Sequence, residues 1–139
     1  MNRILALDYG DKRIGVAISD PLGITAQALE TITVTSKRKS FERIHEIIRD
    51  KKVTKVIVGM PINMDGTRGI RAEVTGNFIS ELQRVESIEI IPWDERLTSV
   101  QAKRIMVFRG QKTGSNKEKV DKLAAALLLE NYLESRAHK

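Results

Sequence analysis

The sequence predicts an α/β domain in which a mixed five-stranded sheet is flanked by helices. The chain opens with two short apolar segments joined by a glycine-containing turn, which is typical of a β-hairpin. Further along, short β-branched segments alternate with segments whose apolar residues recur at helical spacing. No repeat, linker or low-complexity tract interrupts the 139 residues, so we expect a single domain over residues 1–139.

The predicted elements follow in the order β-β-β-α-β-α-β-α-α. Residues 2–8 (NRILALD) form an apolar run typical of a strand buried on both faces, and residues 13–19 (RIGVAIS) complete the hairpin. Residues 28–34 show the alternation of a third strand. Because strand–helix–strand crossovers are right-handed, the later strands should lie parallel to their neighbours.

The second half of the chain alternates helices with strands. Strands are predicted over residues 55–59, ended by Met60-Pro61, and 88–91, ended by Pro92. Polar, glycine-containing segments predict flexible loops at residues 65–71 and 109–116. Helical spacing predicts helices over residues 40–52, 72–85, 98–108 and 117–135.

Composition excludes several classes of protein. The absence of cysteine excludes disulfides, thiolate catalysis and cysteine-ligated zinc. No apolar run approaches the roughly 20 residues of a membrane helix. The first residues lead straight into a strand and leave no room for a signal peptide, so we expect a cytoplasmic protein without a membrane partner. The net charge of +6 and the pI near 9.7 favour a polyanionic partner, although solvated lysines would give the same charge.

Asp8 and Asp121 occupy unusual positions for acids. Asp8 ends the first predicted strand, where ligands gather in open α/β sheets, although a turn aspartate bonded to Gly10 or Asp11 would look the same. Asp121 shares a helix face with apolar residues, and a carboxylate there is costly unless it is paired or bound to a metal. The helix dipole would contribute about 0.3–1 kcal/mol, but a solvent-facing position offers that gain without burial. We therefore interpret Asp121 as functional; its apolar stripe comprises Ala124, Ala125, Leu128, Leu129 and Tyr132.

A third acidic position is the pair Asp94-Glu95, just after the predicted strand at residues 88–91. Neighbouring residues in extended chain point to opposite faces, so only one of the two should enter a shared site. Solvated loop acids, or a salt bridge to Arg96, would explain the pair equally well.

Acids from two strand ends and a helix suit a magnesium site. Mg²⁺ takes oxygen ligands and is held by a few carboxylates together with substrate phosphate. Two such ions about 3.5–4 Å apart can bind the attacking and the leaving oxygen of a phosphoryl displacement. The pattern therefore indicates a metal-assisted phosphodiesterase. His45, in a predicted helix, and His138, in the tail, are interpreted as ordinary residues.

Four segments occur together in one order along nearly the whole chain. They are residues 7–20 (LDYGDKRIGVAISD), 58–66 (VGMPINMDG), 94–99 (DERLTS) and 117–125 (KEKVDKLAA). With these segments the chain resembles the YqgF/RuvX family, described as Holliday junction resolvases and as pre-16S rRNA nucleases. The resemblance implies an RNase H-like three-layer fold. It also implies a catalytic metal site for Mg²⁺ or Mn²⁺ made of Asp8, Asp121 and Glu95, with Asp94 as the alternative to Glu95.

The resemblance further implies a nuclease acting on structured nucleic acid. Processing of the 5′ end of pre-16S rRNA is the commonly assigned role, with ribosome-assembly partners, and cleavage of branched DNA is the alternative. A resolvase would need two active sites and hence a homodimer, whereas an RNA-trimming enzyme would not.

Several residues near the acids are candidates for binding nucleic acid. Gly10 and Gly15 would let backbone approach a phosphate closely. A solvated surface explains each cation equally well, but contact with several phosphates would make binding fall steeply with salt. Because aromatic residues are few, we expect recognition by shape and backbone. The cations are Lys12, Arg13 and Arg96 beside the acids, and Arg68, Arg71, Lys112, Lys117 and Lys119 in the two predicted loops.

Two other classes of protein fit parts of the pattern. An actin- or Hsp70-like nucleotide binder also carries Asp-x-Gly after a first strand, but such proteins use two domains around the nucleotide. A non-catalytic RNA-binding or ribosome-assembly factor would retain the acids as structure only. Binding of ATP would favour the first class, and RNA affinity without metal-dependent cleavage would favour the second.

Overall fold

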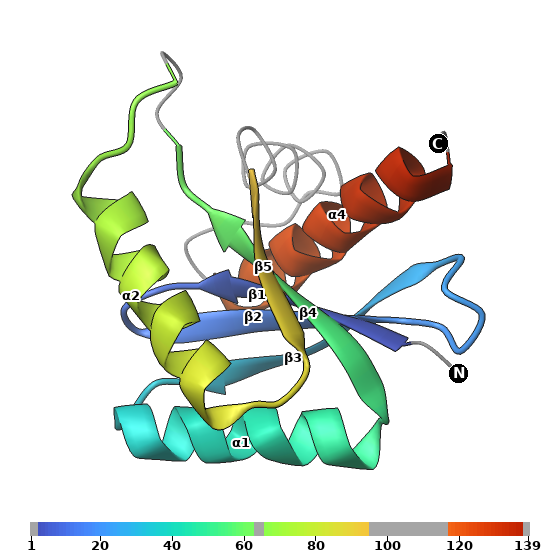
Figure 1. Ribbon diagram of the computed structural model, residues 1–139, viewed down its shortest axis with the longest axis horizontal. Helices are drawn as coiled ribbons and strands as arrows, with labels where there is room; N and C mark the ends of the chain where they lie inside the picture. Colours follow the sequence, from blue (N-terminus) through green and yellow to red (C-terminus); the bar gives the residue numbers. More distant parts are fainter. Residues whose placement is uncertain (1–2, 63–65, 95–116, 138–139) are drawn as a thin grey trace.

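The computed structural model describes residues 3–62, 66–94 and 117–137 of the chain. Within them lie one five-stranded sheet and three long helices (Figure 1). The elements are β1 (Arg3–Tyr9), β2 (Arg13–Ser19), β3 (Ala26–Thr33), α1 (Lys37–Asp50), β4 (Val53–Met60), α2 (Ile70–Val85), β5 (Glu89–Asp94) and α4 (Lys117–Ala137).

The sheet is mixed and has the strand order β3-β2-β1-β4-β5. Strands β1 and β2 form the predicted antiparallel hairpin, and β1, β4 and β5 run parallel, as the crossover rule predicts. The three parallel strands therefore end at the same edge of the sheet, which we call the carboxyl edge. Asp8 and Asp94 lie near the ends of β1 and β5 at this edge.

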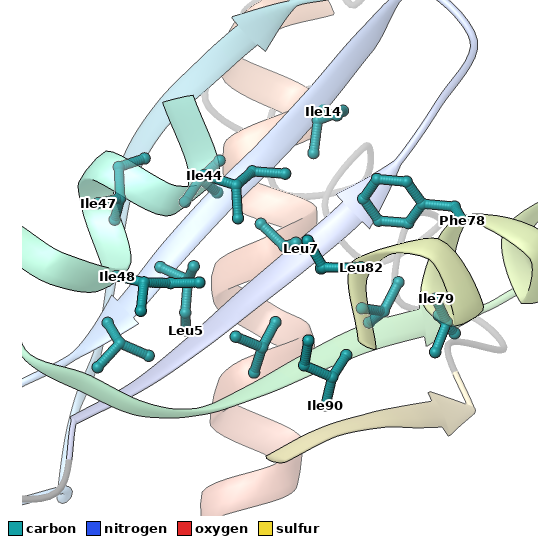
Figure 2. Close-up of a cluster of buried hydrophobic side chains, with 14 of the residues drawn as sticks. Leu5, Leu7, Ile14, Ile44, Ile47, Ile48, Phe78, Ile79, Leu82 and Ile90 are labelled. Carbon is teal, nitrogen blue, oxygen red and sulfur yellow. The ribbon is translucent and has the colours of Figure 1, made fainter. Parts of the chain in front are cut away.

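The two faces of the sheet are covered by different helices (Figure 1). Helices α1 and α2 pack on one face, where Leu5 and Leu7 of β1 are fully buried (Figure 2). Helix α4 packs on the other, where Ile4 and Ala6 are buried against its apolar side chains. Strand β1 is thus buried on both faces, as its continuous apolar run predicted. The three layers confirm the predicted fold class.

Helix α1 begins three residues earlier than the apolar spacing predicted. Ser36 is its N-cap, and the Ser36 hydroxyl accepts a hydrogen bond from the backbone N–H of Lys39 at 3.2 Å. Residues 37–39 are polar and carry no periodicity signal, so the cap rather than the apolar stripe determines where this helix starts.

Strand β5 runs through Pro92, where the sequence predicted that it would end. Pro92 pairs in register with Val58 of β4, and β5 lies at the edge of the sheet. Proline has no backbone N–H to donate, and a strand inside a sheet is hydrogen-bonded to neighbours on both sides. An edge strand such as β5 has a neighbour on one side only, so it can accommodate a proline. The prediction was wrong because it did not assign β5 to an edge.

Two other predicted segments are altered or lie outside the described residues. The loop predicted at residues 65–71 gives way to α2 at Ile70, so Arg71 belongs to a helix. The predicted helix at residues 98–108 and loop at residues 109–116 lie outside the described residues. In the described part of the chain, no helix carries an apolar stretch long enough to cross a membrane.

The connection between β2 and β3 is organised by the carboxylate of Asp20. One carboxylate oxygen accepts hydrogen bonds from the backbone N–H groups of Ile24 and Thr25, both at 2.7 Å, and the other accepts one from Leu22 at 3.2 Å. Gly23 has a φ of 72°, which favours glycine. These N–H groups, first that of Thr25, hold the pKa of Asp20 below its ordinary value of 3.8.

We expect the substitution Asp20→Asn to lower the melting temperature at neutral pH. Because the pKa is lowered in the folded state, the stabilising contribution of Asp20 is fully present above pH 3.8 and is lost as the pH falls through the lowered value. Melting temperatures of both proteins measured from pH 2 to pH 7 should therefore converge at the acidic end. A difference that stays constant with pH would contradict the role of the charge.

Candidate active site at the carboxyl edge

Asp8 lies at the end of the central strand and belongs to the face that α4 covers. Side chains alternate along β1, with Ile4 and Ala6 on the α4 face and Leu5 and Leu7 on the other. Asp8 continues the first series and is partly buried. Its partner in the antiparallel register is Gly15 of β2.

Asp121 comes to the same place from α4, over Gly15. A Cβ atom built on Gly15 would fall on the backbone carbonyl of Asp121 and 3.0 Å from the N atom of Lys122. Directly paired residues in an antiparallel ladder have Cα atoms about 4.5–5.5 Å apart. Asp8 and Asp121 are therefore both neighbours of Gly15, on one face of the sheet. In the structure, the missing side chain of Gly15 lets the backbone of α4 touch β2. The predicted approach of Gly15 to a phosphate stays a prediction.

The apolar stripe predicted around Asp121 is confirmed. Ala125 and Leu129 are fully buried against the sheet, and Tyr132 is nearly so, while Glu130 and Glu134 face solvent. Asp121 sits at the end of this stripe, where its side chain retains 24% exposure. A carboxylate at that position can reach both the sheet and an incoming ligand.

Arg13 holds the Asp121 side chain. Its Nε donates a hydrogen bond to Oδ2 of Asp121 at 2.6 Å, and the Arg13 side chain is itself only 28% exposed. Arg13 begins β2, two residues before Gly15, so alternation puts it on the α4 face as well. The sequence placed Arg13 beside the acids but gave no sign of this pairing, because the two residues are 108 positions apart.

The third acidic position is only partly described. Asp94 is the last residue of β5, and Trp93 before it packs on the α4 face, with its ring 4.9 Å from that of Tyr132. Alternation turns Asp94 toward the opposite face, that of Ile90. Asp94 is thus a strand residue, where the sequence placed it in a loop after the strand. Glu95 lies outside the described residues.

The predicted phosphate-binding residues are distributed unevenly around this edge. Lys12 is exposed in the β1–β2 turn, where Gly10 makes room for the carbonyl of Arg13: an added Cβ would lie 2.7 Å from that oxygen. Arg71 contacts the same turn, with Nη1 3.0 Å from Oδ2 of Asp11 and Nη2 donating to the carbonyl of Tyr9 at 3.4 Å.

The remaining cations lie in other settings. Arg68 is exposed and forms an isolated bridge with Ile62, and Lys119 is exposed in the first turn of α4. Lys117 begins α4, so Lys117 and Lys119 lie in the helix predicted over residues 117–135 rather than in the loop before it. Arg96 and Lys112 lie outside the described residues.

The donor chemistry of this edge suits a hard divalent cation. Asp8 and Asp121 supply carboxylate oxygens, the ligands that Mg²⁺ and Mn²⁺ take in proteins. Within residues 3–62, 66–94 and 117–137, no three acidic or histidine side chains gather closely enough to hold a metal ion. A complete site would need the third acid of the sequence pattern in addition to these two.

The fold places the protein in the RNase H-like class. Among solved structures, the chain is similar to RuvC of T. thermophilus in complex with a Holliday junction, with a TM-score of 0.58, 13% identity and coverage of 97% of this chain and 96% of that one. The Holliday junction resolvase of fowlpox virus is also similar, with a TM-score of 0.55, 15% identity and coverage of 96% and 99%. At these identities the similarity shows the fold.

The family follows from the sequence comparisons. The model of the family described as "RuvX: Holliday junction resolvase" matches residues 2–135. A protein of Acetivibrio thermocellus is 54% identical over 136 residues, covering 96% of each chain, and one of Thermoanaerobacter pseudethanolicus is 49% identical over 138 residues, covering 99% of each. Both carry the description "Putative pre-16S rRNA nuclease". The chain belongs to the RuvX family, as the four sequence segments predicted.

Proposed function

We propose that the protein is a cytoplasmic, metal-dependent endonuclease that cleaves structured RNA at the carboxyl edge of its sheet. The observation that carries the proposal is that Asp8 of β1 and Asp121 of α4, far apart in the sequence, are both neighbours of Gly15. A carboxylate at a strand end and one on a helix, placed on the same face of the sheet, can both serve as oxygen ligands of a divalent cation. The basic charge of the chain supports a polyanionic substrate.

We assign Asp8, Glu95 and Asp121 as the residues that would hold Mg²⁺ or Mn²⁺. Asp94 is the weaker candidate for the middle acid, because the pleat of β5 turns it away from the face of Asp8. When bound, the metal would supply charge neutralisation at the scissile phosphate and a more acidic water. Arg13 would act as a positioning residue, since its guanidinium fixes the Asp121 carboxylate before any cation arrives.

For the substrate we propose a precursor of 16S rRNA, cleaved near its 5′ end. The support comes from the descriptions of relatives that match this chain over nearly their whole length. A four-way DNA junction is the second candidate, because the family model carries the resolvase description. Cleavage of a junction would require a homodimer, which offers an independent readout.

The purified chain should cleave a pre-16S rRNA fragment in Mg²⁺ or Mn²⁺ and remain inactive in EDTA. A four-way DNA junction of matched length, tested in parallel, should be cut more slowly, and sedimentation should report no substrate-induced dimer. Faster cleavage of the junction by a dimer would reverse the order of the two substrates. Tight RNA binding with no cleavage of either substrate in any metal would reject the enzyme and leave a binding protein.

A further inference from the structure

A concavity lies at the same edge of the sheet, on the face opposite Asp8. It has a volume of about 380 Å³ and is formed by the end of β1, the start of β2 and the facing sides of α1 and α2. That volume lies near the lower end of the range typical of small-molecule sites, roughly 300–1,000 Å³. The site described above does not use it.

Three of the few aromatic residues of the chain line this pocket. Tyr9 stacks on Phe78 with ring centroids 4.2 Å apart, and Phe41 meets Phe78 edge-on at 5.6 Å. Aliphatic side chains complete the apolar lining, among them Ile14 and Val74, the latter partly open to solvent. Tyr9 and Phe41 are partly exposed, and a flat, unsaturated ring can stack on such aromatic side chains.

Polar groups also face the pocket. Ser40 is 4% exposed, and among the described residues its Oγ has no hydrogen-bond partner, although it lines the concavity. A buried hydroxyl without a partner costs free energy that a ligand could recover. Asn77 contributes an amide able to donate and accept, and the ion pair between Lys37 Nζ and Glu81, at 3.0 Å, stands at the rim. A ligand of this pocket should therefore combine a flat ring with a hydrogen-bonding edge.

The position of the pocket indicates where such a ring would come from. Tyr9 directly follows Asp8, and adjacent strand residues point to opposite faces. Arg71 donates a hydrogen bond to the carbonyl of Tyr9 and pairs with Asp11. Its positive charge therefore lies where a nucleic-acid strand would cross the edge of the sheet from one face to the other. A nucleic-acid strand with one phosphate at Asp8 would bring a neighbouring base to Tyr9.

We infer that the pocket between α1 and α2 binds an unpaired nucleobase of the strand that is held at the carboxyl edge. This inference rests on the proposed function and deepens it: the enzyme would require an unstacked base close to the scissile phosphate. Single-stranded or bulged RNA supplies such a base, whereas a fully paired duplex does not. The pocket would thus add recognition of a base to the recognition of nucleic-acid shape and backbone that the small number of aromatic residues predicted.

The test is a titration of the full-length protein in EDTA with each of the four ribonucleoside 5′-monophosphates, followed by methyl NMR. The methyl signals of Ile14, Val34 and Val74 should shift saturably with at least one nucleotide. Those of Ile4 and Ile57, on the α4 face, should stay in place. Absence of a saturable shift with every nucleotide at millimolar concentration would overturn the inference.

Two variants and one probe determine what the pocket recognises. Ser40→Ala and Asn77→Ala should each weaken nucleotide binding about tenfold, since a base-edge contact is worth about that factor. Ser80→Ala, on the exposed face of α2, is the matched control and should leave binding unchanged. If indole binds as tightly as any nucleotide and ignores Ser40→Ala, the pocket accepts apolar rings in general and the inference fails.

The readout separates this inference from the nuclease proposal because it needs neither metal nor cleavage. Asp121→Asn should retain nucleotide binding at the pocket. Loss of pocket binding in Ser40→Ala together with undiminished cleavage in Asp121→Asn would support the base site and reject the nuclease site. Cleavage that depends on Asp121, with no nucleotide in the pocket, would do the reverse.

Discussion

Replacing Asp121 with asparagine should lower metal-dependent cleavage by at least about 10–100-fold. Loss of a residue that supports a metal ligand typically costs that much, and loss of the ligand itself should cost no less. The amide has nearly the same shape but lacks the negative charge that a divalent cation requires. The fold should survive, since asparagine can still accept the hydrogen bond from Arg13. Single-turnover cleavage of the pre-16S rRNA fragment measures the rate, and circular dichroism checks the fold.

The matched control lies on the same helix. Glu130→Gln removes a carboxylate from the exposed face of α4 and should leave the rate unchanged. Asp8→Asn should be as damaging as Asp121→Asn, and the double variant no worse than either, because the two acids act as a unit. An Asp121→Asn enzyme that cleaves at the wild-type rate would refute the catalytic assignment.

Gly15→Ala should both destabilise the protein and impair cleavage. The added methyl would collide with the backbone carbonyl of Asp121, which cannot rotate away as a side chain can. Forcing atoms into a packed contact costs typically about 1–3 kcal/mol, and here the displaced element carries a proposed metal ligand. Urea denaturation should report the lost stability, and the cleavage rate should fall even where the variant is fully folded.

Gly76→Ala is the control for this substitution. Gly76 lies inside α2, and a Cβ built there meets no atom within 4 Å apart from its chain neighbours and the backbone of its own helix. Alanine in a helix interior is favoured over glycine by roughly 0.5–1 kcal/mol, so this variant should be at least as stable as the wild type. Equal stability of the Gly15→Ala and Gly76→Ala variants would show that α4 does not need close contact with β2.

Local pattern was sufficient for most of the fold. Strand β2 has the predicted bounds, and the apolar spacing after Asp121 placed the buried face of α4 correctly, because burial on a helix repeats every three to four residues. The end of β5 was missed, because whether a strand tolerates Pro92 depends on its place in the sheet. That place is set by long-range pairing, which no local window of sequence contains.

The candidate site, too, could be predicted only in part from the sequence. Asp121 could be selected from the sequence because it interrupts an apolar helical stripe. A turn aspartate explained Asp8 at least as well, and only the family resemblance singled it out; the assignment of both as metal ligands stays a prediction. The ion pair of Arg13 with Asp121 and the role of Gly15 could not be predicted, because they depend on how α4 lies across β2. The pocket lined by Tyr9, Phe41 and Phe78 was also missed, since the three rings come from three separate elements.

The central claim is that Asp8 and Asp121 share a divalent cation at the carboxyl edge, and paramagnetic broadening by Mn²⁺ tests it most directly. In amide NMR spectra, substoichiometric Mn²⁺ should broaden the signals of Asp8, Gly15 and Asp121 first and leave Ile47, in α1, sharp. The broadening should disappear in Asp121→Asn. Selective broadening elsewhere, or broadening at this edge that persists in Asp121→Asn, would contradict the account.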